Sequence, residues 1–431
     1  MHMKKIIKKI ALLLIVFCIG VGVTLLYTNN KYGVYEKEET KQIKKHVDTI
    51  SMMLETEAKS GNYERTTRES WPTEGYVFNT TLSKCENGGE LSWDDEKKVV
   101  LMSGNVSDKC YVYFDVYVPP RFDEICDETT LACHVAKLYT GTQGENGIYY
   151  HDSSLTNGAG DSSYRYSGAN PNNSVCFGSN ESICPTDNLY RIIGVFGNNV
   201  KLIKYDYGTT DELGTDGDYS KTYKEWGMDS TYKGTYGDGE RIGVYYWNNA
   251  TQTNAWSESL LNKTNLNTNF INNIGEEWAN KIATTTWKVG GNTYSNIYSK
   301  TPSVVYQNEI VSPVTTNTTD NATEYTAKIG LMYVSDYGFA ADPSAWTLTM
   351  GSYNNTTATS TNWMYMGLYE WTISRRADDS GGAFRVVSGG GVGGDGVNGN
   401  DAVRPSFNLE SSITYASGSG TQSDPIRITK L

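Results

Sequence analysis

The residues best suited to chemistry lie in the last third of the chain, and their types favour sugar binding. Aromatic faces stack on the C–H surfaces of sugar rings, while planar Asp, Asn and Arg groups hydrogen-bond to hydroxyls. The candidate ligand-binding residues are Trp363, Tyr365, Arg375, Arg376, Asp378, Asp379, Asp395, Asn398 and Asn400. In the competing interpretation, the two aromatic residues belong to the core and the charged residues form a solvated rim.

The stretch 371–409 must position most of these side chains. Trp371, Ile373, Phe384 and Val386 have the alternation of strands with one buried face. Between them and the ordered segment 403–409 lies a glycine-rich run, and glycine weakens both strands and helices. We therefore predict a long loop at 389–399, held by two framework strands, whose backbone can approach a ligand. A solvated loop without a partner is the alternative.

The sequence does not favour catalysis. Acid–base and nucleophilic chemistry at neutral pH usually needs a histidine, an activated cysteine or paired carboxylates. Of the four histidines, His134 and His151 lie beyond the N-terminal region. His151 and Asp152 could form a dyad, but an exposed loop histidine is the more common situation. We predict a protein that is not an enzyme and has no catalytic residues.

Two acidic groups have spacings that would suit calcium, which prefers oxygen ligands. Neither matches the 12-residue EF-hand loop, so the prediction is no cofactor and no metal, with calcium as the alternative. The two groups are Asp211, Asp216 and Asp218, and Asp378, Asp379 and Asp395.

The N-terminal sequence indicates export. Residues 10–27 form an uncharged apolar run, and four lysines precede it. Such a run can cross a hydrocarbon core of roughly 30 Å, and the lysines place the N-terminus in the cytoplasm. We expect residues 1–9 to be a cytoplasmic tail, residues 10–27 a single-pass anchor in membrane lipid, and the rest extracellular. A cleaved signal peptide is the alternative. With a formal net charge of −12, nucleic acid is not an expected partner.

Six cysteines lie beyond the apolar run, and an even number fits disulfides in an oxidising compartment. No C-x-x-C motif or nearby histidine cluster supports metal binding instead. Fifteen pairings are possible. Short separation in the sequence favours Cys85–Cys110, Cys126–Cys133 and Cys176–Cys184.

The predicted fold class is α+β, with several segments in series. An apolar stripe at Ile43, Val47, Ile50 and Leu54 predicts a stalk helix within 28–62, through which the chain could self-associate. Residues 63–120 then form a small antiparallel β domain stapled by a disulfide, and residues 121–146 a disulfide-containing linker. This outline resembles a type IV pilin over residues 1–120, although no glycine ends a leader and no glutamate lies in the apolar run.

Local patterns predict further elements in the C-terminal region. Residues 190–205 form a hairpin around Gly197. Residues 256–274 have the spacing of one or two short helices, interrupted near Lys263. A second hairpin is expected at 287–294 around Gly290 and Gly291, and a buried strand at 329–334 followed by a loop.

Several motifs in 147–431 resemble an uncharacterised Firmicutes family of surface proteins, catalogued as a domain of unknown function. They are YRYSGANPNN, LYRIIGVF with VKLI, NAWSESLLNKTNLNTNFINNI, YEWTISRR and AVRPSFNL. Tyr190 stands where that family usually has Trp, and Ser374-Arg375 inverts its usual Arg-Ser. The family is similar to the C-type lectin-like fold that also underlies formylglycine-generating enzymes. The resemblance therefore implies a C-type lectin-like domain over 147–431. The reaction of formylglycine-generating enzymes is not expected, because it uses cysteines in the C-terminal half of the domain and no cysteine follows Cys184.

Taken together, these patterns predict a bacterial protein of the cell membrane that presents its C-terminal domain for adhesion or ligand recognition. The expected partner is an extracellular glycan or protein. A pilin-like filament subunit and a structural envelope protein are the alternatives.

Overall fold

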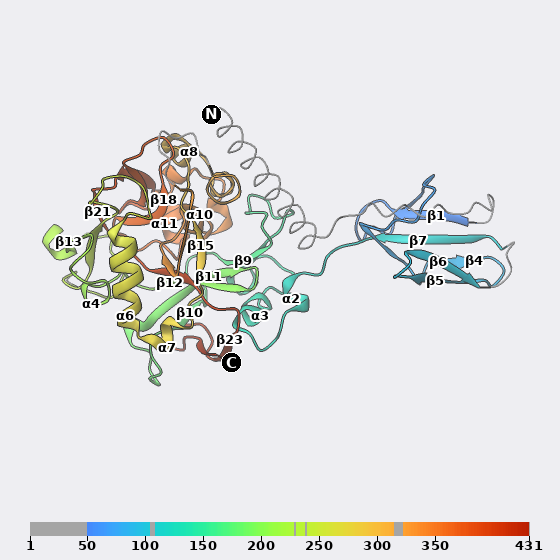
Figure 1. Ribbon diagram of the computed structural model, residues 1–431, viewed down its shortest axis with the longest axis horizontal. Coiled ribbons are helices and arrows are strands. Elements are labelled where there is room, and N and C mark those ends of the chain that lie inside the picture. The colour runs from blue at the N-terminus through green and yellow to red at the C-terminus, as the bar shows by residue number, and fades with distance from the viewer. Residues whose placement is uncertain (1–49, 104–107, 228–229, 238, 314–321, 431) are drawn as a thin grey trace, which may run out of the picture. The chain divides into compact units, whose positions relative to one another are not determined.

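The computed structural model describes residues 50–103, 108–227, 230–237, 239–313 and 322–430 (Figure 1). The chain forms two compact units, one ending at Pro119 and the other beginning at Pro120. The predicted tail, the predicted anchor and residues 28–49 of the predicted stalk lie outside the described residues. Among the described helices, none combines the length and apolar character needed to cross a bilayer.

The first unit is a mixed sheet with an added hairpin. β1 pairs in parallel with β7, β2 adds to β1, β3 and β4 pair with β7, and β5 pairs with β6. The strands are β1 (Ile50–Glu55), β2 (Tyr63–Arg65), β3 (Tyr76–Phe78), β4 (Lys84–Cys85), β5 (Glu90–Asp94), β6 (Val99–Ser103) and β7 (Cys110–Val116).

The predicted stalk helix is wrong where the structure describes it, because β1 occupies residues 50–55. Ile50 and Leu54 are spaced for a helix, but with Met52 they also alternate as a strand does. Met52 packs with Val112 and Phe114 in the core of this unit. The described strand pairs within 63–120 are antiparallel, and a parallel pairing joins β7 to β1, which precedes that range.

The second unit contains two larger sheets and two small ladders. The first sheet has the order β17-β22-β12-β11-β9-β8, with β10 on β11, and the second has the order β13-β14-β21-β18-β19-β20. The first sheet comprises β8 (Ile148–His151), β9 (Ser163–Tyr166), β10 (Ser174–Cys176), β11 (Leu189–Phe196), β12 (Asn199–Lys204), β17 (Ile329–Gly330) and β22 (Ser406–Asn408). The second comprises β13 (Tyr219–Thr222), β14 (Gly243–Tyr246), β18 (Glu370–Arg375), β19 (Gly382–Val386), β20 (Val392–Gly396) and β21 (Asn400–Ala402). The ladders pair β15 (Thr285–Lys288) with β16 (Glu324–Ala327) and β23 (Ile413–Ser417) with β24 (Arg427–Lys430).

The helices of the second unit are short. They are α2 (Phe122–Ile125), α3 (Leu131–Ala136), η1 (Glu145–Gly147), η2 (Thr186–Asn188), α4 (Thr210–Leu213), α5 (Tyr223–Trp226), η3 (Leu261–Phe270), α6 (Ile271–Ile274), α7 (Glu276–Ala279), α8 (Tyr294–Ser299), α9 (Pro302–Tyr306), η4 (Gln307–Val311), α10 (Val334–Phe339), η5 (Pro343–Ala345), η6 (Met350–Ser352) and α11 (Thr356–Thr361). The predicted α+β fold, with its stalk helix and C-type lectin-like domain, is therefore wrong: the described chain is mainly β-sheet. Abundant Asn, Thr, Ser, Gly and Tyr favour strands and turns over long helices.

Several local predictions can be checked directly. The hairpin around Gly197 is confirmed as β11 and β12. The three disulfides are confirmed with the favoured pairing. The helix at 261–274 runs through Lys263 and ends before Gly275. The hairpin around Gly290 is wrong, because Trp287 pairs with Tyr325 in the distant strand β16.

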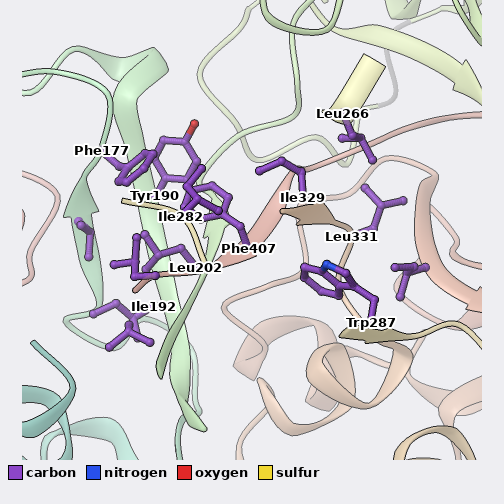
Figure 2. Packing of buried hydrophobic residues seen from close by; sticks show 14 of the residues in the cluster. Phe177, Tyr190, Ile192, Leu202, Leu266, Ile282, Trp287, Ile329, Leu331 and Phe407 are labelled. Carbon is purple, nitrogen blue, oxygen red and sulfur yellow. The ribbon is translucent and has the colours of Figure 1, made fainter. Parts of the chain in front are cut away.

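The main core of the second unit lies against its first sheet. Figure 2 shows Tyr190 of β11, Leu202 of β12 and Phe407 of β22 packed together, with Trp287 beside Ile329 and Leu331. The rings of Tyr190 and Phe407 are 5.5 Å apart between centroids. Residues from distant parts of the sequence thus share one apolar interior.

A buried ion pair lies where the chain passes from the second sheet to the first. Arg404, between β21 and β22, places Nε 2.7 Å and Nη2 2.9 Å from the two carboxylate oxygens of Glu370 at the start of β18. Arg404 Nη2 also donates to the carbonyl oxygen of Met364 at 2.7 Å. Both side chains are almost fully buried. Burial raises the pKa of Glu370, and the charge of Arg404 opposes that shift.

We expect Glu370→Gln to destabilise the second unit by about 3 kcal/mol or more, because it leaves the guanidinium of Arg404 buried without a counter-charge. Urea unfolding of the full chain, followed by tryptophan fluorescence, measures the change. The matched control is Glu240→Gln, which breaks the exposed pair with Lys224 and should change the free energy of unfolding by less than about 1 kcal/mol. Equal effects of the two substitutions would contradict the role given to Glu370.

Candidate functional site

The structure separates the nine predicted binding residues into a buried set and a surface set. Trp363, Tyr365 and Arg375 are buried. The Trp363 indole N–H donates to the carbonyl oxygen of Tyr166 at 2.9 Å, and the Tyr365 hydroxyl donates to that of Ser388. The two aromatic side chains belong to the interior, as the competing interpretation proposed, but Arg375 is buried too and not part of a solvated rim.

Arg376, Asp378 and Asp379 lie at the surface and bind one another. Arg376 Nε lies 3.2 Å from Asp378 Oδ1, and its Nη1 lies 3.1 Å from Asp379 Oδ2. Asp378 also accepts the backbone N–H of Tyr294 at 3.1 Å. The polar groups of this cluster are largely committed to internal contacts.

The predicted glycine loop contains a strand in its middle, flanked by two turns. Residues 392–396 form β20 and pair with β19, and the turn before it is packed, with the carbonyl oxygen of Gly390 accepting the hydroxyl of Tyr337 at 2.6 Å. A Cβ at Gly394 would lie 3.0 Å from the ring of Tyr294. Here glycine removes side-chain bulk and lets the strand lie close to its neighbours.

Of the other three predicted residues, Asp395 lies within β20, and Asn398 and Asn400 come after it. Asn398 is exposed in the turn after β20. Asn400 donates to the hydroxyl of Ser220 at 2.9 Å. Asp395 pairs with Arg385, with 2.7 Å between the carboxylate and Nη1.

Neither histidine in the described part of the chain hydrogen-bonds to Asp152. His151 is buried, not exposed as the sequence suggested; its Nδ1 accepts the N–H of Ala159 at 3.1 Å. Asp152 instead accepts hydrogen bonds from the following turn, including the N–H of Ser154. The ring of His134 stacks on Tyr415, with 3.7 Å between centroids.

The two acidic groups considered for calcium do not gather. Asp218 is buried and accepts the N–H groups of Leu261 and Asn249, whereas Asp211 is largely exposed. Within the part of the chain that the structure describes, three potential metal ligands come together only at Cys85, Asp108 and Cys110. The two cysteines there form a disulfide.

A pocket of about 150 Å³ in the second unit brings together aromatic and charged side chains that the sequence analysis did not single out. Ligand sites are typically concave and mainly apolar, with a few convergent polar groups. The lining residues come from β9, β11, β12, β15, α9, η4, α10, β22 and their flanks. They are Asp161, Arg165, Phe196, Lys201, Thr285, Trp287, Tyr306, Ile310, Tyr333, Ser335, Asp336 and Asn408.

Two cations of the protein lie against the aromatic walls of this pocket. Lys201 Nζ is 4.1 Å from the ring centroid of Tyr333 and 5.2 Å from that of Trp287. The Arg165 guanidinium carbon is 4.6 Å from the centroid of Phe196 and 5.2 Å from that of Tyr306. Such contacts stabilise a cation most when water is excluded.

Two carboxylates balance these cations. Asp336 Oδ2 lies 2.5 Å from Lys201 Nζ, and Oδ1 lies 3.6 Å from Arg165 Nη1. Asp161 Oδ2 lies 2.6 Å from Arg165 Nη2. Burial lowers the pKa of Lys201, and Asp336 opposes the shift. Burial would raise the pKa of Asp161, but the charge of Arg165 holds it below its ordinary value. Ionisable groups with altered pKa values are common in functional sites.

Local structure fixes each of these groups. Lys201 projects from β12 in the middle of the first sheet. Asp336 caps α10 by accepting the N–H of Tyr333 at 3.0 Å. Trp287 is held on β15 by its indole N–H, which donates to the carbonyl oxygen of Ala327 at 3.2 Å. No local motif unites residues 161 to 408, but a lysine inside the apolar strand VKLI was a usable signal.

Comparison with family models, with curated proteins and with solved structures gives no match for this chain. The resemblance to the Firmicutes surface-protein family therefore stays a prediction. The case for function depends on the pocket and its chemistry.

Close to the predicted surface set, Asp401 of β21 is fully buried and accepts Arg385 Nη1 at 3.0 Å. Burial raises the pKa of Asp401 to about 7 from an ordinary value of 3.8, and the charge of Arg385 opposes this shift. The folded protein therefore retains a proton that the unfolded chain loses between these two values.

We expect the stability of the second unit to fall as pH rises from about 4 to about 7, by up to about 4 kcal/mol from this group. Asp401→Asn should flatten the profile across this window. Urea unfolding at several pH values measures it, with Asp211→Asn, an exposed carboxylate, as the matched control. A profile that Asp401→Asn leaves unchanged would contradict the assignment.

Proposed function

We propose that this chain is a cell-surface recognition protein, and that the pocket around Lys201 binds one ring of an extracellular glycan. A single observation carries the proposal: aromatic faces and charge-balanced hydrogen-bonding groups converge on one small pocket. Recognition here requires no catalytic group. Adhesion to a glycan-bearing surface is one use of such binding.

The size of the pocket supports a single ring as the ligand. A cavity of about 150 Å³ accommodates a benzene-sized molecule, and the pocket has that volume. A six-membered sugar ring at the end of a glycan fits this description better than a chain of residues does. The remaining sugars would stay outside the pocket.

The charges of the pocket support a neutral, hydroxyl-bearing ligand. Arg165 and Lys201 are matched by Asp161 and Asp336, so the charges of the residues that line the pocket cancel. The protein's own cations already lie against the rings, which disfavours a ligand ammonium group there. Carboxylate and guanidinium groups remain suited to sugar hydroxyls.

Export supports a ligand outside the cell. Three disulfides are typical of chains that fold in an oxidising compartment. The apolar run at 10–27, which lies outside the described residues, would hold the protein at the membrane through lipid contacts.

We expect the full-length protein in detergent to show saturable binding on an array of mono- and oligosaccharides. Phe196→Ala removes one aromatic wall of the pocket, and Asp161→Asn removes a counter-charge of Arg165. Each substitution should weaken binding at least about tenfold. Calorimetric titration with the strongest array ligand measures the change.

Two substitutions away from the pocket serve as controls. Ile183→Ala trims an exposed apolar side chain, and Asp211→Asn neutralises an exposed carboxylate; both should bind as the unmodified protein does. Absence of saturable binding to every glycan, or equal affinity of all four variants, would reject the proposal.

A further inference from the structure

We propose that Lys201 and Asp336 join covalently, through an amide bond between Lys201 Nζ and Asp336 Cγ, so that an intramolecular cross-link ties β12 to α10. This modification goes beyond ligand recognition and does not depend on it. The two residues are 135 positions apart in the sequence.

The two reacting groups are already in contact in a nearly dry site. Lys201 Nζ lies 2.5 Å from Asp336 Oδ2, and the residues are 4% and 3% exposed. Each is held by further contacts: the lysine ammonium by the face of Tyr333, and the carboxylate by the N–H of Tyr333. Fixed proximity of this kind replaces an encounter between separate molecules and greatly raises the rate of bond formation.

The surroundings favour the free amine that the reaction needs. Trp287, Tyr333 and Phe196 surround the Lys201 ammonium within 6 Å of their ring centroids, and burial lowers its pKa. A desolvated lysine is a better nucleophile because more of it is unprotonated. Burial of the lysine among aromatic rings distinguishes the Lys201–Asp336 pair from an exposed salt bridge.

A third, fully buried carboxyl group can hold the proton during the reaction. Glu309 of η4 is 0% exposed and contacts the first turn of α10, the helix that carries Asp336. It accepts the N–H groups of Val334 and Ser335 at 3.1 Å, and the hydroxyl of Ser374. Burial raises its pKa, which suits a group that takes up and returns a proton.

The step balances without a further reactant. The ammonium gives one proton to Glu309, and the free amine attacks Asp336 Cγ. The C–O bond to one carboxylate oxygen then breaks, and that oxygen leaves as water with the proton from Glu309 and a second proton from the nitrogen. The remaining oxygen becomes the amide carbonyl, beside Arg165 Nη1. One positive and one negative charge disappear together, so the pocket stays balanced.

The test is the mass of the full-length protein after reduction of its disulfides. We expect it to be lower than the sequence mass by one water, about 18 Da. Tryptic digestion should give residues 192–204, uncleaved after Lys201, joined to residues 329–375. The unmodified mass, with separate peptides ending at Lys201, would overturn the proposal.

Two variants separate the covalent bond from the ion pair. Lys201→Arg keeps the charge opposite Asp336 and should show its full sequence mass, with a melting temperature several degrees lower than that of the unmodified protein. Glu309→Gln should leave most molecules uncross-linked while their circular dichroism stays native. A loss of water that persists in Lys201→Arg would place the bond elsewhere and reject this assignment.

Discussion

Burial of paired charges is the constraint on which the second unit depends. Glu370 and Arg404 meet in a bidentate pair at the passage between the two sheets, and Lys201 and Asp336 meet between β12 and α10. A buried charge without its partner is strongly destabilising, whereas a matched pair is tolerated. Each pair therefore fixes where two distant segments must meet, although neither adds much stability by itself.

The pocket follows from the same constraint. Lys201 lies in a strand whose neighbours are apolar, so its ammonium must find a carboxylate and aromatic faces inside the protein. Tyr333 and Asp336 supply both because the N-cap of α10 presents them together. Arg165 of β9 likewise has a carboxylate, Asp161, and an aromatic face, Phe196, as its partners. The aromatic side chains that solvate the two cations also form the walls that a ligand would touch.

Local patterns predicted what local interactions decide. The β11–β12 hairpin follows from two β-rich arms around Gly197, and short loops between cysteines predicted the disulfide pairs. Prediction failed where two periodicities coincide, as at Ile50 and Leu54 in β1, or where the partner is distant, as for Trp287 and β16. The pocket escaped prediction because its residues are scattered from 161 to 408 and only the tertiary fold unites them.

The glycine-rich segment shows why composition alone mispredicted the local structure. A run of glycines predicts a free loop, because glycine weakens regular structure. In β20 it has the opposite use: without side chains, Gly394 lies close to Tyr294 and Arg376, and the strand still pairs fully with β19. The chain thus uses glycine where neighbours crowd the sheet, and uses aromatic residues where a cavity must be kept open. A lysine inside an apolar strand is therefore a sequence signal of buried charge pairing, as at Lys201 and Asp336.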